Sequence, residues 1–193
     1  MRQGGLRHRF PAGSQDSGPG KVGRRLVGHL HEEGASLAVT DLDRDRAARV
    51  AEEYGAEPLD PEEIYDARCD IFSPCALGGV LNRETVPRLK CRVVAGAANN
   101  QLATEADGEE LHRRGVLYAP DYVINSGGLI QVVGELEGMD REAVYRRASG
   151  VYQAIERIIA ISRERGIPTY RAADIMAEER LRAVGAVGRM YLP

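Results

Sequence analysis

The chain has 193 residues, of which 43% are hydrophobic and 28% charged, and its formal net charge is −3. These values are typical of a globular protein with one complete core and room for a small appendage. They give no general reason to expect a nucleic-acid or membrane partner. No apolar run approaches the roughly 18 residues that span a bilayer, and no signal-peptide core is present, so we expect a cytoplasmic protein.

Residues 1–17 contain few apolar side chains among glycine, arginine, proline and serine. Their composition predicts an irregular, disordered tail. We therefore expect one domain over residues 18–193, including helices at its C-terminal end.

A glycine-rich turn follows at Gly18-Pro19-Gly20-Lys21-Val22-Gly23 and fits the pattern G-x-G-x-x-G of dinucleotide-binding folds. The first glycine makes the turn, the second lets the backbone approach a pyrophosphate, and the third lets a helix sit close to the sheet. Phosphate is then favoured at the helix N-terminus. In a chain with 22 glycines, however, this pattern alone is weak evidence.

A helix and a short strand are predicted directly after this turn. Apolar residues recur at helical spacing over residues 22–30, Gly34 is placed to end the helix, and a buried strand follows at 37–39. Asp41 stands at the end of that strand, about 20 residues past the second glycine, where a carboxylate binds the adenosine ribose of NAD and disfavours NADP. Arg44 and Arg46 weaken this charge argument, and an ordinary connection without a ligand is the alternative.

The tail creates a difficulty, because a dinucleotide fingerprint should directly follow an apolar strand. We expect the first strand to be missing or degenerate, which would leave two central strands with open edges. Residues 5–12 could serve as a poor substitute, the remaining strands could close up, or the domain could be weakly stable. A damaged or misread start ahead of an intact domain is our hypothesis for this beginning.

The remaining chain alternates helices with short strands. A helix is predicted over 43–54, capped by Asp43 and ended by Gly55. Further helices are predicted from residue 60 and over 104–114, and strands over 69–72, 93–96 and 116–119. Loops follow the strands at 73–79, 97–101 and 120–128, and the last helices are Arg141–Arg165 and Tyr170–Val184. This pattern predicts an α/β fold with a Rossmann-like, doubly wound, mainly parallel sheet, whose ligands bind beyond the carboxyl ends of the strands.

The cysteines and histidines point to no metal site. Cys69, Cys75 and Cys91 are odd in number and contain no C-x-x-C pair, so we expect small buried residues, with neither a disulfide framework nor zinc. His29 and His31 lie two apart on a helix and face different directions.

Three motifs in the loops carry a resemblance to a known family. They are 75–79 (CALGG), 95–102 (AGAANNQL) and 118–128 (YAPDYVINSGG). In this order they resemble the Glu/Leu/Phe/Val dehydrogenase family, most closely its leucine and valine dehydrogenases, and the resemblance extends from about residue 18 to the C-terminus. The family oxidises an amino acid to an oxo acid and ammonia with NAD.

The resemblance implies a set of cofactor-binding residues. The pyrophosphate would be bound by Gly18, Gly20, Lys21, Val22 and Gly23, and the adenosine ribose by Asp41. The adenosine side would be lined by Cys75, Ala76 and Leu77, and the nicotinamide ribose by Ala95, Gly96 and Asn99. Asn125 would orient the nicotinamide amide or the substrate. Asparagine suits the last role, because it both donates to and accepts from a carboxamide. Ala97 departs from the usual serine of the family and removes one hydrogen bond.

The same resemblance places Leu129 and Val132 against the substrate side chain, although simple helix packing explains each of them equally well. Two apolar residues favour a branched aliphatic amino acid over glutamate, whose second carboxylate would need a cationic partner. The catalytic lysines and aspartate of the family precede the fingerprint, in a substrate domain. Neither Lys21 nor Lys90 suits that role, so we nominate no catalytic residue.

The sequence thus favours the NAD-binding domain of a leucine- or valine-dehydrogenase-like enzyme, inactive without a substrate domain. The alternatives are a stand-alone NAD-binding module without turnover and a protein that associates with an intact dehydrogenase. We expect NAD(H) and a small aliphatic amino acid as ligands, and a homo-oligomer or association with a substrate domain is possible. Neither nucleic acid nor membrane is expected as a partner.

Overall fold

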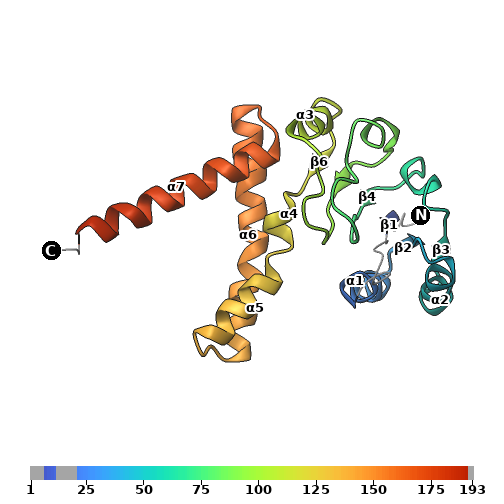
Figure 1. Ribbon diagram of the computed structural model, residues 1–193, viewed down its shortest axis with the longest axis horizontal. Coiled ribbons are helices and arrows are strands. Elements are labelled where there is room, and N and C mark those ends of the chain that lie inside the picture. The colour runs from blue at the N-terminus through green and yellow to red at the C-terminus, as the bar shows by residue number, and fades with distance from the viewer. Residues whose placement is uncertain (1–6, 12–20, 191–193) are drawn as a thin grey trace, which may run out of the picture. The chain divides into compact units, whose positions relative to one another are not determined.

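The computed structural model describes residues 7–11 and 21–190. It divides into two compact units, Met1–Asn125 and Ser126–Pro193. The first unit is an α/β structure built on six parallel strands in the order β3-β2-β1-β4-β5-β6 (Figure 1). The strands are β1 (Arg7–Pro11), β2 (Ser36–Thr40), β3 (Glu57–Pro58), β4 (Ile71–Phe72), β5 (Val93–Val94) and β6 (Leu117–Tyr118).

Strand β1 decides between the alternatives for the first strand: it is not missing, and residues 7–11, within the predicted substitute 5–12, form it. It lies between β2 and β4, with Arg7 opposite Ser36 and Arg9 opposite Phe72. A segment between two parallel neighbours pairs through its backbone groups whatever its side chains, which explains why residues 7–11 form a strand within the predicted disordered tail. Pro11 is its last residue, where a missing N–H disturbs pairing least. The rest of residues 1–17 lies outside the described ranges.

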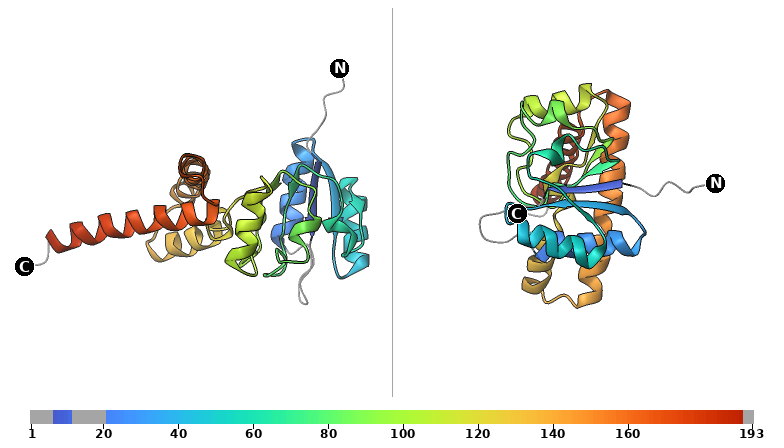
Figure 2. Two further views of the ribbon diagram at one scale, coloured as in Figure 1. Left: turned by 90° about the horizontal axis from the view of Figure 1, so that it is seen from above. Right: turned by 90° about the vertical axis from the view of Figure 1, so that its right-hand side faces the viewer.

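Helices α1 (Lys21–Glu32) and α2 (Arg44–Tyr54) enclose a core with β2, as predicted. Its buried members are Val27, Leu37, Val39, Val50 and Ala51. The α2 cap is also confirmed, since the Asp43 carboxylate accepts from Arg46 N and Gly55 ends the helix at φ 62°. In Figure 2 these two helices lie close to the β2 and β3 strands.

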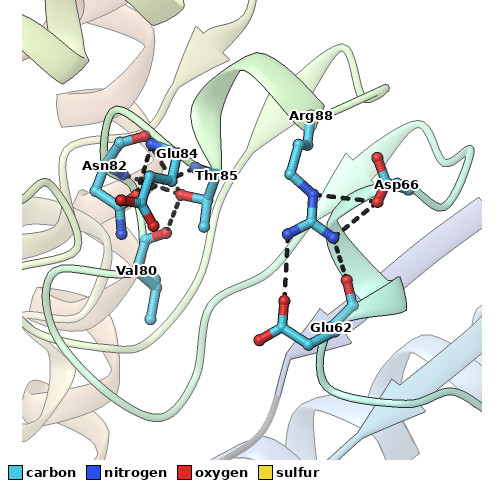
Figure 3. Close-up of polar contacts among 7 residues, drawn as sticks. All are labelled: Glu62, Asp66, Val80, Asn82, Glu84, Thr85 and Arg88. Carbon is cyan, nitrogen blue, oxygen red and sulfur yellow. Dashed lines mark hydrogen bonds and ion pairs between the residues drawn. The ribbon is translucent and has the colours of Figure 1, made fainter.

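Two short 3₁₀ helices are joined by one arginine (Figure 3). Arg88 of η2 (Val86–Arg88) donates from Nε and Nη2 to Asp66 Oδ2, at 3.1 and 2.7 Å, and from Nη1 to Glu62 Oε2. Asp66 follows η1 (Glu63–Tyr65), and the Arg88 guanidinium also stacks on the Tyr65 ring. The guanidinium thereby ties the chain before β4 to the chain before β5.

Residues 120–128, predicted as a loop, contain helix. Asp121–Ile124 forms α4 and Gly127 begins α5 (Gly127–Leu136). The pattern Asn125-Ser126-Gly127-Gly128 suggested a turn, but consecutive i to i−4 bonds such as Asn125 N to Asp121 O, at 2.9 Å, satisfy the backbone here. Helix α3 (Glu105–Arg113) precedes β6 as predicted, with Thr104 and Asp107 forming its capping box.

The second unit consists of α5, α6 (Arg141–Arg165) and α7 (Thr169–Met190). The predicted bounds of α6 are confirmed, with Asp140 as N-cap and Gly166 at φ 63° as its end. The apolar spacing of α7 predicts Leu181 and Val184 on its inner side, but the two residues are 72% and 63% exposed. The helical period places both on one face, and the described side chains of this unit do not cover that face. Within the described residues, no helix is long and apolar enough to cross a membrane.

Candidate functional site

Asp41 follows β2 and is only 1% exposed. Its Oδ1 accepts from the Asp43 backbone N–H at 2.9 Å, while Oδ2 is buried without a hydrogen-bond partner among the described residues. Burial is the main cause that raises the pKa of this carboxyl above its ordinary value of 3.8. A buried carboxylate oxygen without a partner is unfavourable in isolation, so Asp41 is suited to accept hydrogen bonds from a ligand hydroxyl.

The two arginines near Asp41 both have acidic partners. Arg46 donates from Nε and Nη2 to Asp43 Oδ2, at 3.2 and 3.0 Å, and Arg44 Nη2 lies 2.8 Å from Asp60 Oδ1. The Arg46 guanidinium and backbone N–H keep the pKa of Asp43 below its usual range. Both guanidiniums therefore already have an acidic partner other than the Asp41 carboxylate.

The loops after β4 and β5 pack against each other through their backbones. A Cβ on Gly96 would lie 2.0 Å from Pro74 O and 2.4 Å from Pro74 N, so no other residue fits this position. Ala98 N donates to the same Pro74 oxygen at 2.9 Å. Gly96 thus has a clear structural role in addition to the cofactor role that the family resemblance implies.

Gln101 organises the β5 loop and is a residue whose role the sequence prediction missed. Its side chain is fully buried, and its Nε2 donates to the carbonyls of Gly96 and Ala98 at 2.8 and 2.9 Å. Its backbone N–H donates to Asp121 Oδ2 at 2.7 Å, which connects this loop to α4. The only sequence signal was its place at the end of an amide-rich motif.

Two amide side chains that the family resemblance assigned to neighbouring parts of the cofactor meet at the end of this loop. Asn125 Nδ2 donates to Asn99 Oδ1 at 2.6 Å, and both side chains retain groups for a further partner. Asn125 follows α4 and Asn99 follows β5, so the contact joins residues 26 apart. Paired amides of this kind can bind a carboxamide, which needs one donor and one acceptor.

The predicted adenosine-side residues begin at Cys75, which packs against the core of α1, β2 and α2. Burial raises the pKa of its thiol, against a smaller opposing hydrogen bond from the Ala97 backbone. Ala76 is half-buried and Leu77 is 47% exposed. The structure therefore gives Cys75 a packing role and leaves Leu77 accessible to a ligand. Ala95, on the neighbouring loop, is half-buried, and its backbone N–H donates to Phe72 O at 3.0 Å.

The glycine turn is only partly described. Gly18 and Gly20 lie outside the described residues, and Lys21 is the first residue of α1. Gly23 is buried, in agreement with close helix packing, whereas Val22 is 61% exposed and does not join the apolar stripe that was predicted for it.

Leu129 and Val132 belong to α5 in the second unit and are 67% and 54% exposed. Their three-residue spacing places them on one helix face. Neither side chain is buried by packing within this unit, so both remain available to contact a ligand side chain.

Comparisons with known proteins identify the family of this chain. A family model described as Glutamate/Leucine/Phenylalanine/Valine dehydrogenase matches residues 37–184. The leucine dehydrogenase of Thermoactinomyces intermedius is 52% identical over 85% of this chain and 45% of its own length. The L-tryptophan dehydrogenase of Nostoc punctiforme is 46% identical over 85% of this chain and 47% of its own length.

Solved structures show the same relationship. The crystal structure of L-tryptophan dehydrogenase from Nostoc punctiforme has a TM-score of 0.88 at 40% identity, covering 94% of this chain and 54% of its own. Hetero-hexameric glutamate dehydrogenase from Thermus thermophilus, at 23% identity and a TM-score of 0.66, covers 90% of this chain and 45% of its own and shares the fold. The chain spans about half the length of the curated relatives it matches. With its α/β fold, its loop motifs and its family match in agreement, the chain belongs to the Glu/Leu/Phe/Val dehydrogenase family of oxidoreductases.

Proposed function

We propose that this chain is the NAD-binding domain of a dehydrogenase that oxidises a branched-chain aliphatic L-amino acid, leucine- or valine-like, to its 2-oxo acid and ammonia. The observation that carries the proposal is the buried Asp41 carboxylate, whose Oδ2 has no hydrogen-bond partner among the described residues. A buried acceptor beyond the carboxyl end of β2 suits ribose hydroxyls. The strand order β3-β2-β1-β4-β5-β6 supports a doubly wound, Rossmann-like sheet.

The preference for NAD over NADP follows from charge. The 2′-phosphate of NADP would bring negative charge next to Asp41. Arg44 is paired with Asp60 and Arg46 with Asp43, so both guanidiniums already have acidic partners and offset that repulsion less than free cations would. The two ion pairs therefore favour NAD over NADP.

Each residue of the proposed site has a distinct task. When bound, NAD supplies the acceptor for the hydride of the substrate α-carbon. The glycine turn and the start of α1 bind the pyrophosphate. Asn125 orients the carboxamide of the nicotinamide, while Asn99, which accepts from Asn125 Nδ2, borders the nicotinamide ribose. Leu129 and Val132 supply apolar surface for an aliphatic substrate side chain.

None of these residues is an acid–base group suited to the substrate amine. The two lysines occur at the start of α1 and before β5, Lys21 and Lys90. Substrate oxidation needs a proton acceptor held close to the α-carbon, and we infer that the chain alone binds the cofactor without turnover. A cytoplasmic location remains a prediction from composition.

The test is calorimetric titration of the monodisperse chain with NADH and with NADPH. We expect saturable NADH binding, and NADPH binding weaker by about tenfold or more, because one unfavourable charge contact is added. Asp41→Ser should weaken NADH binding and narrow the difference between the two cofactors. Asp45→Ser removes an exposed charge from the first turn of α2 and is the matched control. Equal affinity of the wild-type chain for both cofactors would contradict the proposal.

A further inference from the structure

Cys69 and Cys91 face each other at the amino-terminal ends of β4 and β5, away from the loops of the proposed cofactor site. The strands are parallel, and the bridge between Arg68 and Lys90 keeps their register. Cys69 and Cys91 are therefore register partners whose side chains lie on the same face. Neighbouring strands are about 4.8 Å apart, within the roughly 4.4–6.8 Å between Cα atoms that a disulfide spans.

The two thiols also interact with each other and with a cation. A hydrogen bond between them is the main cause that lowers the pKa of Cys91, and the positive charge of Arg114 lowers it further. Arg114 Nη2 donates to Leu89 O at 2.7 Å, while its Nη1 is buried and has no hydrogen-bond partner in the described part of the chain. A guanidinium with an unused N–H stabilises a neighbouring thiolate.

A pocket of about 450 Å³ opens onto the first of these cysteines and is lined by Arg68, Cys69, Asp70, Lys90 and Arg92. The lining contains three cationic side chains and one carboxylate, so the pocket favours an anionic ligand or reagent. Cys69 is half-buried on the pocket wall, whereas Cys91 is only 9% exposed. A small reagent can therefore reach Cys69 first and Cys91 only afterwards.

We propose that Cys69 and Cys91 form a redox site at which a small anionic disulfide, of the type of oxidised glutathione, converts the pair to an intrachain disulfide. This inference is independent of the proposed cofactor function. The three cysteines are free in the structure, as predicted, and the register adds that Cys69 and Cys91, 22 residues apart in the sequence, are neighbours.

The chemistry is two successive thiol–disulfide exchanges. The hydrogen-bonded pair loses one proton to water, and the proton that the two sulfurs share passes from Cys69 to Cys91. The Cys69 thiolate attacks one sulfur of the reagent, whose S–S bond breaks, and the first reagent thiolate leaves and takes a proton from water. Cys91 then gives its proton to water and attacks Cys69 Sγ, and the second reagent thiolate leaves and is protonated in the same way. Two electrons pass from the cysteine pair to the reagent, giving one intrachain disulfide and two reagent thiols.

The test treats the reduced full-length chain with oxidised glutathione or with cystamine, a cationic disulfide. Thiols are counted in denaturant, and intact masses and linked peptides are measured. We expect oxidised glutathione to remove two of the three thiols and to link Cys69 to Cys91, with Cys75 left free. The rate advantage of glutathione over cystamine should fall about tenfold in a Lys90→Glu/Arg92→Glu variant and as salt is raised. Arg83→Glu/Arg163→Glu changes the charge by the same amount at two exposed positions outside the pocket lining and is the matched charge control.

Single variants separate the two steps. Cys91→Ser should stop at a mixed disulfide on Cys69, Cys69→Ser should stay reduced under the same conditions, and Cys75→Ser should still form the link. A wild-type chain that is folded by circular dichroism and keeps all three thiols would overturn the proposal, whether or not it binds NADH. A persistent mixed disulfide on the wild-type chain, or a link to Cys75, would overturn it as well.

Discussion

The two units differ in how closely their glycines are packed. In the first unit, a Cβ on Gly96 would lie only 2.0 Å from Pro74 O, whereas in the second unit a Cβ on Gly150, in the middle of α6, would meet open space. Apolar side chains differ in the same way. Those of β2, α1 and α2 form a closed core, while Leu129, Val132 and Leu136 of α5 are more than half exposed. The first unit is thus specified by close internal contacts, and the second presents surface that its own helices do not cover.

The largest expected effect is that of Gly96→Ala. The new methyl group would overlap Pro74 O and N, and neither backbone atom can move without shifting the β4 loop. We expect the free energy of unfolding to fall by about 3 kcal/mol or more. Denaturant unfolding followed by circular dichroism measures this loss. If Gly96→Ala unfolds at the wild-type midpoint, the close contact between the loops does not exist in solution.

Asp41 gives the next effect, through pH. Because burial raises its pKa above 3.8, the carboxylate takes up a proton at a higher pH than an exposed aspartate. NADH affinity should therefore fall as the pH decreases through the raised pKa, by about tenfold overall, since the protonated form is a poorer acceptor of ribose hydroxyls. Calorimetric titrations at several pH values measure this fall, and Asp41→Asn should abolish the step.

The same group has an opposite effect on the protein without cofactor. A folded-state pKa above the unfolded value means that the native state binds more protons between the two values, so the contribution of Asp41 to stability decreases as the pH rises through that window. Denaturant midpoints of the wild-type and Asp41→Asn chains, compared from pH 3.8 upwards, test the sign. A wild-type midpoint that rises more steeply than that of the variant would show that burial does not dominate.

Gly150→Ala should act in the reverse direction to Gly96→Ala. The position is helical and open, so alanine adds no clash and reduces the freedom of the unfolded chain. We expect stabilisation of about 0.5–1 kcal/mol, measured as a higher denaturant midpoint at unchanged slope. A loss of stability would indicate that this face of α6 is covered by a second copy or another chain.

The smallest stability effect is expected for Leu129→Thr. Leu129 is 67% exposed, and its truncation removes little buried apolar area, so the free energy of unfolding should change by less than about 0.5 kcal/mol. NADH affinity should also stay within about twofold, because the side chain is assigned to the substrate and not to the cofactor. A larger loss of stability, read from the same unfolding curves, would show that Leu129 is a packing residue.

Local rules determined much of this protein from its sequence. Asp43 and Gly55 mark the ends of α2, and Gly166 marks the end of α6, because capping and left-handed backbone geometry depend on neighbouring residues alone. The position of Asp41 after β2 followed from an apolar run and an acidic residue at its end.

Tertiary structure decided what depends on distant residues. Strand β1 forms because two parallel neighbours supply its backbone partners, although its side chains do not predict a strand. Gln101 and Asp121 meet across 20 residues, and Cys69 faces Cys91 through strand register. The exposure of Leu181 also depends on distant residues. An apolar stripe predicts which face of a helix its side chains share, but only the tertiary structure decides whether another element packs against that face.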